Sequence, residues 1–229
     1  MFDLALVTGA TSGIGKALVH LLHKKKIETV GLGSRDGDLS TEEGRQAVRA
    51  LIREKKPNLV INSAGLGFYG RSIELPLGDL NKIIDVNVKA VMEITLEAAH
   101  VLRDSQKKGV ILNVSSIGGE FPLPGHAVYG GSKAFVTKFS EALDYEMKGE
   151  GIRVLASCPG MVATEFSSRA AKKRVERKGA FVLSAEQAAA TIWGQIVTGR
   201  TVHLFPFRYR LLSFLPSALL KKMIYKRMT

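Results

Sequence analysis

The stretch "LVTGATSGIGKAL" (residues 6–18) passes from an apolar, β-branched run through a glycine-rich turn into a helical pattern. Residues 4–8 predict a buried strand, and the apolar spacing over residues 14–24 predicts a helix. A strand that leads directly into a helix is the first half of a βαβ unit, which places the next strand parallel to the first. The stretch therefore predicts an α/β fold built on a parallel sheet.

The three glycines of this turn leave backbone room for a ligand at the start of the helix. Gly9 permits a tight turn, while Gly13 and Gly15 leave space where unpaired N–H groups and the helix dipole favour an anion. The spacing is not G-x-G-x-x-G, so the interpretation rests on the place of the turn in the first βα unit, where doubly wound folds hold a dinucleotide. A structural turn with incidental glycines is the alternative.

Strand-like and helical patterns keep alternating along the rest of the chain. This alternation predicts a Rossmann-like, doubly wound parallel sheet in a three-layer α/β/α arrangement, with ligands at the carboxyl ends of its strands. Further strands are expected at residues 28–33, 58–62, 109–115, 152–157 and 201–205, and further helices at 41–55, 77–103, 127–148 and 185–198.

One part of this pattern is short. Only Asp36 and Gly37 separate Arg35 from Asp38, where a doubly wound sheet normally has another helix and strand. We expect that helix to be missing and its strand to be vestigial, so that the third strand/helix region after Arg35 is truncated.

Length and composition predict one domain over residues 1–229. The chain has 45% hydrophobic and 24% charged residues, which suits a globular domain with a substantial core. It has no apolar run of 18 residues and no leader pattern, so a cytoplasmic protein is expected. Cys158 is the only cysteine, which excludes an internal disulfide and a cysteine metal cluster. We expect no metal site.

The formal charge of +12 arises from 33 Lys and Arg against 21 Asp and Glu, with basic clusters at residues 24–26, 172–178 and 208–227. No recognised nucleic-acid-binding motif accompanies these clusters. Solvated helix faces and attraction of small anionic ligands therefore explain the charge better, and no nucleic-acid partner is expected.

The tail at residues 207–229 is both apolar and basic. Its apolar part, residues 211–220, is too short to span a bilayer and contains Pro216. Weak contact with a membrane surface is one interpretation. Packing against another subunit and closure of a substrate pocket are the alternatives.

The end of the second expected strand bears on the choice of cofactor. An acidic residue there would bind a ribose 2′-hydroxyl, whereas an arginine accommodates a 2′-phosphate. The chain has Ser34 followed by Arg35, whose planar guanidinium suits a phosphate. NADP(H) is therefore predicted over NAD(H), although Asp36 is adjacent and a surface role for Arg35 stays open.

Tyr129 and Lys133 stand four residues apart and share one helix face. An ammonium beside a phenol stabilises the phenolate and lowers the phenol pKa from about 10. The pair therefore suggests a tyrosine acid, although a lysine packed beside a half-buried tyrosine has the same spacing. We expect Gly130 and Gly131 to leave room for cofactor and substrate; close helix packing is the alternative.

A set of motifs occurs in one order along the chain and resembles the short-chain dehydrogenase/reductase family of the Tyr-x-x-x-Lys type. The likeness spans residues 4 to about 205. The motifs are "TGATSGIG" at 8–15, "NSAG" at 62–65, Asn87 in "DVNVKA", "NVSS" at 113–116, "YGGSK" at 129–133 and "PGMVAT" at 159–164.

The resemblance implies four catalytic residues. Tyr129 would be the general acid/base, Lys133 would lower its pKa and bind the nicotinamide ribose, Ser116 would orient the substrate carbonyl, and Asn87 would hold a proton-relay water. Ser115 competes with Ser116, but the interval to the tyrosine matches the family with Ser116.

The resemblance also implies a cofactor site along the whole edge of the sheet. Ser63 departs from the commoner second asparagine of the family motif, which we expect to be tolerated. The implied cofactor residues are Gly9, Ser12, Gly13, Ile14, Gly15, Arg35, Asp38, Leu39, Asn62, Ala64, Gly65, Tyr129, Lys133, Pro159, Gly160, Val162 and Thr164.

The function implied is an NAD(P)H-dependent oxidoreductase that reduces a carbonyl, or oxidises the matching alcohol, on an apolar or lipid-like small molecule. A 3-oxoacyl thioester reductase and a catalytically silent NADP(H)-binding sensor or scaffold are the alternatives. The family further implies a homodimer or homotetramer. Residues 165–184 are expected over the substrate, with His126 near Tyr129.

Overall fold

Six parallel strands form one sheet in the computed structural model, which describes residues 2–171 and 182–207. The order across the sheet is β2-β1-β3-β4-β5-β6, so the chain winds outward in both directions from β1. The strands are β1 (Leu4–Thr8), β2 (Glu28–Leu32), β3 (Leu59–Asn62), β4 (Gly109–Val114), β5 (Ile152–Pro159) and β6 (Val202–Phe205). The predicted Rossmann-like parallel sheet is confirmed.

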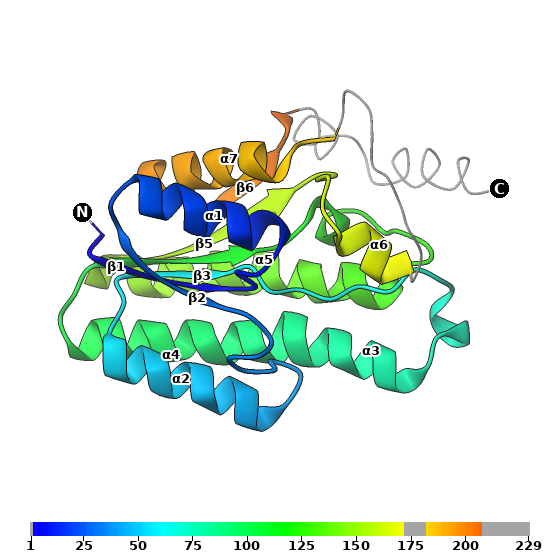
Figure 1. Ribbon diagram of the computed structural model, residues 1–229, viewed down its shortest axis with the longest axis horizontal. Coiled ribbons are helices and arrows are strands. Elements are labelled where there is room, and N and C mark those ends of the chain that lie inside the picture. Colours follow the sequence, from blue (N-terminus) through cyan, green and yellow to red (C-terminus); the bar gives the residue numbers. More distant parts are fainter. Residues whose placement is uncertain (1, 172–181, 208–229) are drawn as a thin grey trace.

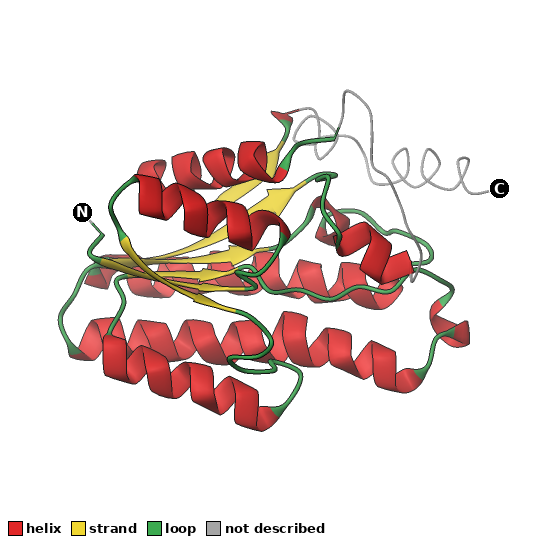
Figure 2. Ribbon diagram, viewed as in Figure 1, coloured by secondary structure: helices red, strands yellow, loops and turns green. Residues whose placement is uncertain are grey.

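Helices cover both faces of this sheet, as Figures 1 and 2 show. One face carries α1 (Gly13–Lys24) and α7 (Ala185–Thr198). The other carries α2 (Glu42–Lys55), α4 (Ala90–Asp104) and α5 (Ala127–Met147). The strands between them are buried on both sides, which explains their continuous apolar runs. The three-layer arrangement is therefore confirmed.

The helix predicted over residues 77–103 contains a change of helical type. It consists of α3 (Leu77–Ile84), a π-helical turn η2 (Asp85–Lys89) and α4. A π turn inserts one extra residue into a helix, and such turns often mark functional sites. This one contains the fully buried Asn87. The remaining short helices are α6 (Phe166–Ala171), η1 (Ser72–Glu74), η3 (Ile117–Gly119) and η4 (Lys148–Glu150).

The truncation after Arg35 is real and more complete than expected. Residues 33–41, all of which are described, contain neither a helix nor a strand, so the predicted vestigial strand is absent. β2 consequently pairs only with β1 and forms an edge of the sheet. A turn takes the place of the missing elements: the Asp38 carboxylate accepts from the N–H and the hydroxyl of Ser40, and the Asp38 carbonyl accepts from the N–H of Thr41.

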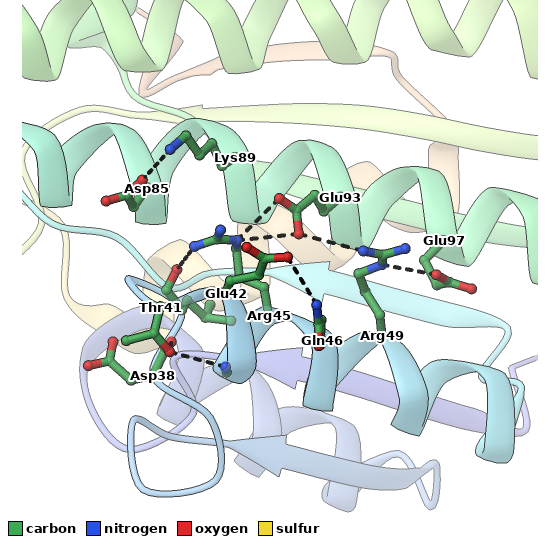
Figure 3. Close-up of polar contacts among 12 residues, drawn as sticks. Asp38, Thr41, Glu42, Arg45, Gln46, Arg49, Asp85, Lys89, Glu93 and Glu97 are labelled. Carbon is green, nitrogen blue, oxygen red and sulfur yellow. Dashed lines mark hydrogen bonds and ion pairs between the residues drawn. The ribbon is translucent and has the colours of Figure 1, made fainter.

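An ion-pair ladder beside this turn joins α2 to α4 (Figure 3). Glu93 accepts from Arg45 Nε at 3.2 Å, and Glu97 accepts from Arg49 Nε at 3.0 Å and from Arg53 Nη1 at 2.7 Å. Arg45 also donates to the carbonyl of Leu39 at 3.3 Å and is largely buried. The ladder therefore fastens the turn that replaces the missing elements to the helical layer.

The described residues bear on the expected absence of membrane spans and metal sites and on the environment of Cys158. Within residues 2–171 and 182–207, no helix has both the length and the apolar character needed to cross a membrane. The same residues contain no group of three metal-binding side chains that could hold an ion. Cys158 is buried, and burial raises the pKa of its thiol to about 12. Most of the tail, residues 208–229, lies outside the described residues, so its role stays a prediction.

Replacing Arg45 by Met is expected to lower the free energy of unfolding by about 2 kcal/mol, because a buried, charge-assisted hydrogen bond is lost and the Leu39 carbonyl loses a donor. Arg53→Met is the matched control at the exposed end of the ladder and should cost less than about 1 kcal/mol. Urea unfolding of both variants measures the difference. Equal losses would show that the ladder contributes through charge alone and does not anchor the turn.

Candidate active site

A cleft of about 590 Å³ runs along the carboxyl ends of the strands. It brings together segments that are far apart in the sequence, from the first βα turn to α6. Ser116, Tyr129 and Lys133 line it, as do these predicted cofactor residues: Gly9, Ser12, Gly13, Ile14, Gly15, Asp38, Leu39, Ala64, Gly65, Pro159, Gly160, Val162 and Thr164.

The glycine-rich turn is packed tightly against the sheet. A Cβ on Gly15 would lie 2.2 Å from the carbonyl oxygen of Gly9, and a Cβ on Gly9 would lie 2.8 Å from Ala64 backbone atoms. Gly9 also has a φ of 68°, which favours glycine. These contacts bring the start of α1 close to the sheet edge and leave its backbone open to the cleft.

The first turn of α1 fits an anion. Ser12 is the N-cap residue, yet its side chain makes no capping bond to the helix N–H groups, and the first turn contains no acidic residue. Unpaired N–H groups and the positive end of the helix dipole therefore face the cleft without a negative charge from this turn. Such a terminus suits a pyrophosphate, so the residues present fit a dinucleotide.

Tyr129 and Lys133 lie together in the cleft on one face of α5. The Lys133 ammonium is 6.0 Å from the centre of the Tyr129 ring and donates a 2.9 Å hydrogen bond to the carbonyl of Val114 at the end of β4. Lys133 is only 4% exposed. The predicted convergence of the phenol and the ammonium is therefore present in the structure.

Burial shifts the pKa values of Tyr129 and Lys133 in the directions that favour their neutral forms. Burial raises the pKa of Tyr129 to about 12, while a hydrogen bond with Ser116 opposes that rise. Burial lowers the pKa of Lys133 to about 8. The tyrosine pKa therefore lies above its ordinary value, because desolvation of the phenolate outweighs the hydrogen bond with Ser116. The lowering expected from Lys133 stays a prediction.

The two candidate serines have different surroundings. The Ser115 hydroxyl donates to the carbonyl of Lys133 at 2.8 Å and lies 2.8 Å from the Thr137 hydroxyl, so it holds α5 against β4. The Ser116 hydroxyl accepts from the N–H of Gly118 at 3.0 Å and bonds to Tyr129. This arrangement favours Ser116 as the serine that acts with the tyrosine.

Two predicted asparagines lie behind the cleft and do not line it. The Asn87 amide pairs with the N–H and carbonyl of Leu66, both at 2.9 Å, and donates to Ser132 at 3.0 Å. Asn62 donates to Asn113 at 2.8 Å, and both residues are buried. Asn87 therefore ties the loop after β3 to α5, whereas Asn62 belongs to a buried polar network between the sheet and helices α4 and α5.

Two other predictions concern residues that do not line the cleft. Arg35 is exposed and does not line the cleft, although its neighbour Ser34 does. Gly130 and Gly131 do not line this cleft either, so the room that they were expected to leave for cofactor and substrate stays a prediction. A Cβ on Gly130 would lie 3.0 Å from the carbonyl oxygen of Gly118, which shows that this glycine permits close packing against η3.

The sequence did not single out several side chains of the substrate half. The rings of Tyr69 and His126 lie 4.4 Å apart, and the Phe166 ring lies 5.6 Å from that of Tyr129. Arg169 also lines the cleft. His126 was expected near Tyr129, but Tyr69 and Phe166 had no signal beyond their places shortly after the "NSAG" and "PGMVAT" motifs.

Comparison with known proteins agrees with this geometry. A family model described as short chain dehydrogenase matches residues 34–175. The chain belongs to the short-chain dehydrogenase/reductase family. Sulfoacetaldehyde reductase 2 of Chromohalobacter salexigens, a similar protein, is 32% identical over 190 residues, which cover 73% of this chain and 75% of the relative.

Two solved structures show the same fold as this family member. One is a short-chain dehydrogenase from Sphingobium yanoikuyae in complex with NADPH, with a TM-score of 0.78, 23% identity, and coverage of 99% of this chain and 94% of the other. The second is a short-chain dehydrogenase/reductase from Burkholderia phymatum in complex with NAD, with a TM-score of 0.78, 21% identity, and coverage of 96% and 95%. At these identities the likeness concerns the fold alone.

The buried Lys133 should give this reductase-family chain a pH-dependent stability. Between about pH 8 and pH 10 the unfolded chain keeps the lysine proton that the folded chain releases, so the free energy of unfolding should rise with pH. Lys133→Met should remove this contribution, which is about 2 kcal/mol over that interval. Denaturant unfolding at several pH values measures it. Lys138→Met, an exposed site on the same helix, is the control; a slope unchanged by Lys133→Met contradicts the assignment.

Proposed function

We propose that this chain is an NAD(P)H-dependent oxidoreductase that interconverts a carbonyl and an alcohol on an apolar small molecule. The observation that carries the proposal is the meeting of Ser116, Tyr129 and Lys133 in one cleft with an anion-binding helix terminus. Membership of the short-chain dehydrogenase/reductase family supports the same activity.

In this proposal Tyr129 is the proton donor for carbonyl reduction. With a pKa of about 12 its hydroxyl keeps its proton at neutral pH, and the bond with Ser116 fixes the direction of that hydroxyl. Ser116 orients the carbonyl oxygen, and Lys133 places a positive charge where the phenolate develops. A bound nicotinamide would supply or accept the hydride. Asn87 acts through Leu66 and Ser132, so its proposed part is to position the site.

The cleft walls support an apolar substrate. The cleft lining includes the apolar side chains of Leu66, Leu123, Met161 and Phe166, with Tyr69 and His126 as polar members, and Phe166 packs against the Tyr129 ring. Such a lining binds an apolar body by burial and leaves few groups to fix its orientation. Ketones, aldehydes and 3-oxoacyl thioesters of increasing chain length are the substrates to assay.

Turnover by Tyr129→Phe should fall roughly 100- to 10,000-fold, because the general acid is removed while the ring and its packing remain. The dissociation constant for NADPH should change little. Tyr145→Phe, an exposed tyrosine on the same helix, should leave both quantities unchanged. NADPH oxidation with an accepted carbonyl and NADPH fluorescence titration provide the measurements. Full turnover by Tyr129→Phe would exclude this acid, and NADPH binding without turnover on any substrate would favour a silent sensor or scaffold.

We further propose NADP(H) as the preferred cofactor. Ser34 lines the cleft at the end of β2, and the next residue, Arg35, is an exposed cation. A flexible guanidinium at that place suits a 2′-phosphate. The related structures bound to NADPH and to NAD leave both cofactors open to the family fold.

The preference predicts that Arg35→Gln weakens NADPH binding about tenfold and leaves NADH binding unchanged, because only NADPH carries the 2′-phosphate. Arg103→Gln removes an exposed arginine on α4 and is the control for net charge. Fluorescence titration with both dinucleotides distinguishes the cases. Equal affinity of the parent protein for NADH and NADPH would refute the preference.

The expected domain organisation, oligomeric state, location and role of the tail remain proposals. One catalytic domain over residues 1–229, a homodimer or homotetramer, and a cytoplasmic location follow from the sequence and the family. Weak membrane contact through the tail competes with subunit packing and closure of the pocket.

A further inference from the structure

Helix α6 reaches from the substrate half of the cleft to the glycine-rich turn. Arg169 donates a 3.1 Å hydrogen bond from Nη2 to the Ser12 hydroxyl, which lies 157 residues earlier in the chain. Both residues line the cleft. An arginine from the segment after the last family motif therefore lies at the entrance of the first helix.

The charge at this contact is unbalanced. Ser12 is the N-cap of α1, so Arg169 places a guanidinium at the positive end of a helix whose first turn has no acidic residue. Glu165 is 3.9 Å from Arg169 Nη1, and both side chains are exposed, so this pair contributes little. Two positive groups that face the same space are stabilised together by an anion between them.

We propose that Arg169 binds the pyrophosphate of the dinucleotide together with the N–H groups at the start of α1. This inference rests on the proposed function, since it needs a dinucleotide in the cleft. The pyrophosphate is favoured over the 2′-phosphate because Arg169 lies at the N-cap of α1, whereas a 2′-phosphate is expected at the end of β2 beside Ser34.

The same short helix also forms part of the substrate wall. Phe166, three residues before Arg169, packs against the Tyr129 ring, and the carbonyl of Ala170 accepts a 3.0 Å hydrogen bond from the N–H of Tyr69. A phosphate held by Arg169 thus fixes the element that packs on the catalytic tyrosine. Loss of Arg169 should therefore also raise the KM for the carbonyl substrate, with a smaller effect on kcat.

Three variants test the assignment in the full-length protein. Arg169→Gln removes the charge and keeps a polar side chain of moderate length, Arg169→Lys keeps the charge without the planar fork, and Arg71→Gln removes an exposed arginine elsewhere. NADPH and NADH dissociation constants are measured by fluorescence titration at fixed ionic strength. Arg169→Gln should weaken both about tenfold, Arg169→Lys should recover part of the loss, and Arg71→Gln should match the parent.

Comparing the dissociation constants of NADPH and NADH distinguishes the possible results. A loss shared by NADPH and NADH supports contact with the pyrophosphate, which both contain. A loss confined to NADPH would assign Arg169 to the 2′-phosphate and overturn the inference, as would unchanged affinity for both. If the parent protein binds neither dinucleotide, the proposed function itself fails; if the parent binds and turns over while Arg169→Gln is unchanged, only the inference fails.

Discussion

The buried ammonium of Lys133 is the constraint on which the catalytic end of the molecule depends. A charge that is 4% exposed requires a close acceptor, and the Val114 carbonyl at the end of β4 provides it. The lysine backbone is fixed in turn by Ser115, which donates to the Lys133 carbonyl. These contacts set the position of α5 along β4. Tyr129, one helical turn earlier, is thereby held at the edge of the cleft.

Because a helix and a strand are missing after Arg35, helices α2 and α4 support the turn that replaces them. In their absence the turn at Asp38 and Leu39 must form part of the cleft without a flanking strand. Leu39 is buried among residues of α2 and α4, and its carbonyl is bound by Arg45. Packing and the ion-pair ladder thus replace strand pairing at this edge of the cleft. The turn and the ion-pair ladder therefore form this edge of the cleft together.

The sequence predicted the fold well because the parallel strands are buried on both faces and therefore appear as unbroken apolar runs. It also located Tyr129 and Lys133, because residues four apart must share a helix face. It did not indicate that burial raises the tyrosine pKa, since burial depends on segments far away in the chain. It left two roles open for Gly130, because spacing alone does not tell which neighbour a helix face meets. Arg169 lies in the segment 165–184 that the sequence placed over the substrate, but its contact with Ser12 could not be located, because the two residues are 157 positions apart.

The π turn fixes the rotational phase of the long helix that contains it. Asn87 sits in this turn and clamps both Leu66 and Ser132, so the residues before and after it are committed to different neighbours. Each residue advances an α-helix by about 100°, so a one-residue deletion that restored regular geometry would turn α3 by that angle against α4. The apolar stripe of α3 would then face a new direction. The length of this segment is therefore restrained as tightly as the identity of Asn87, whose amide makes both contacts.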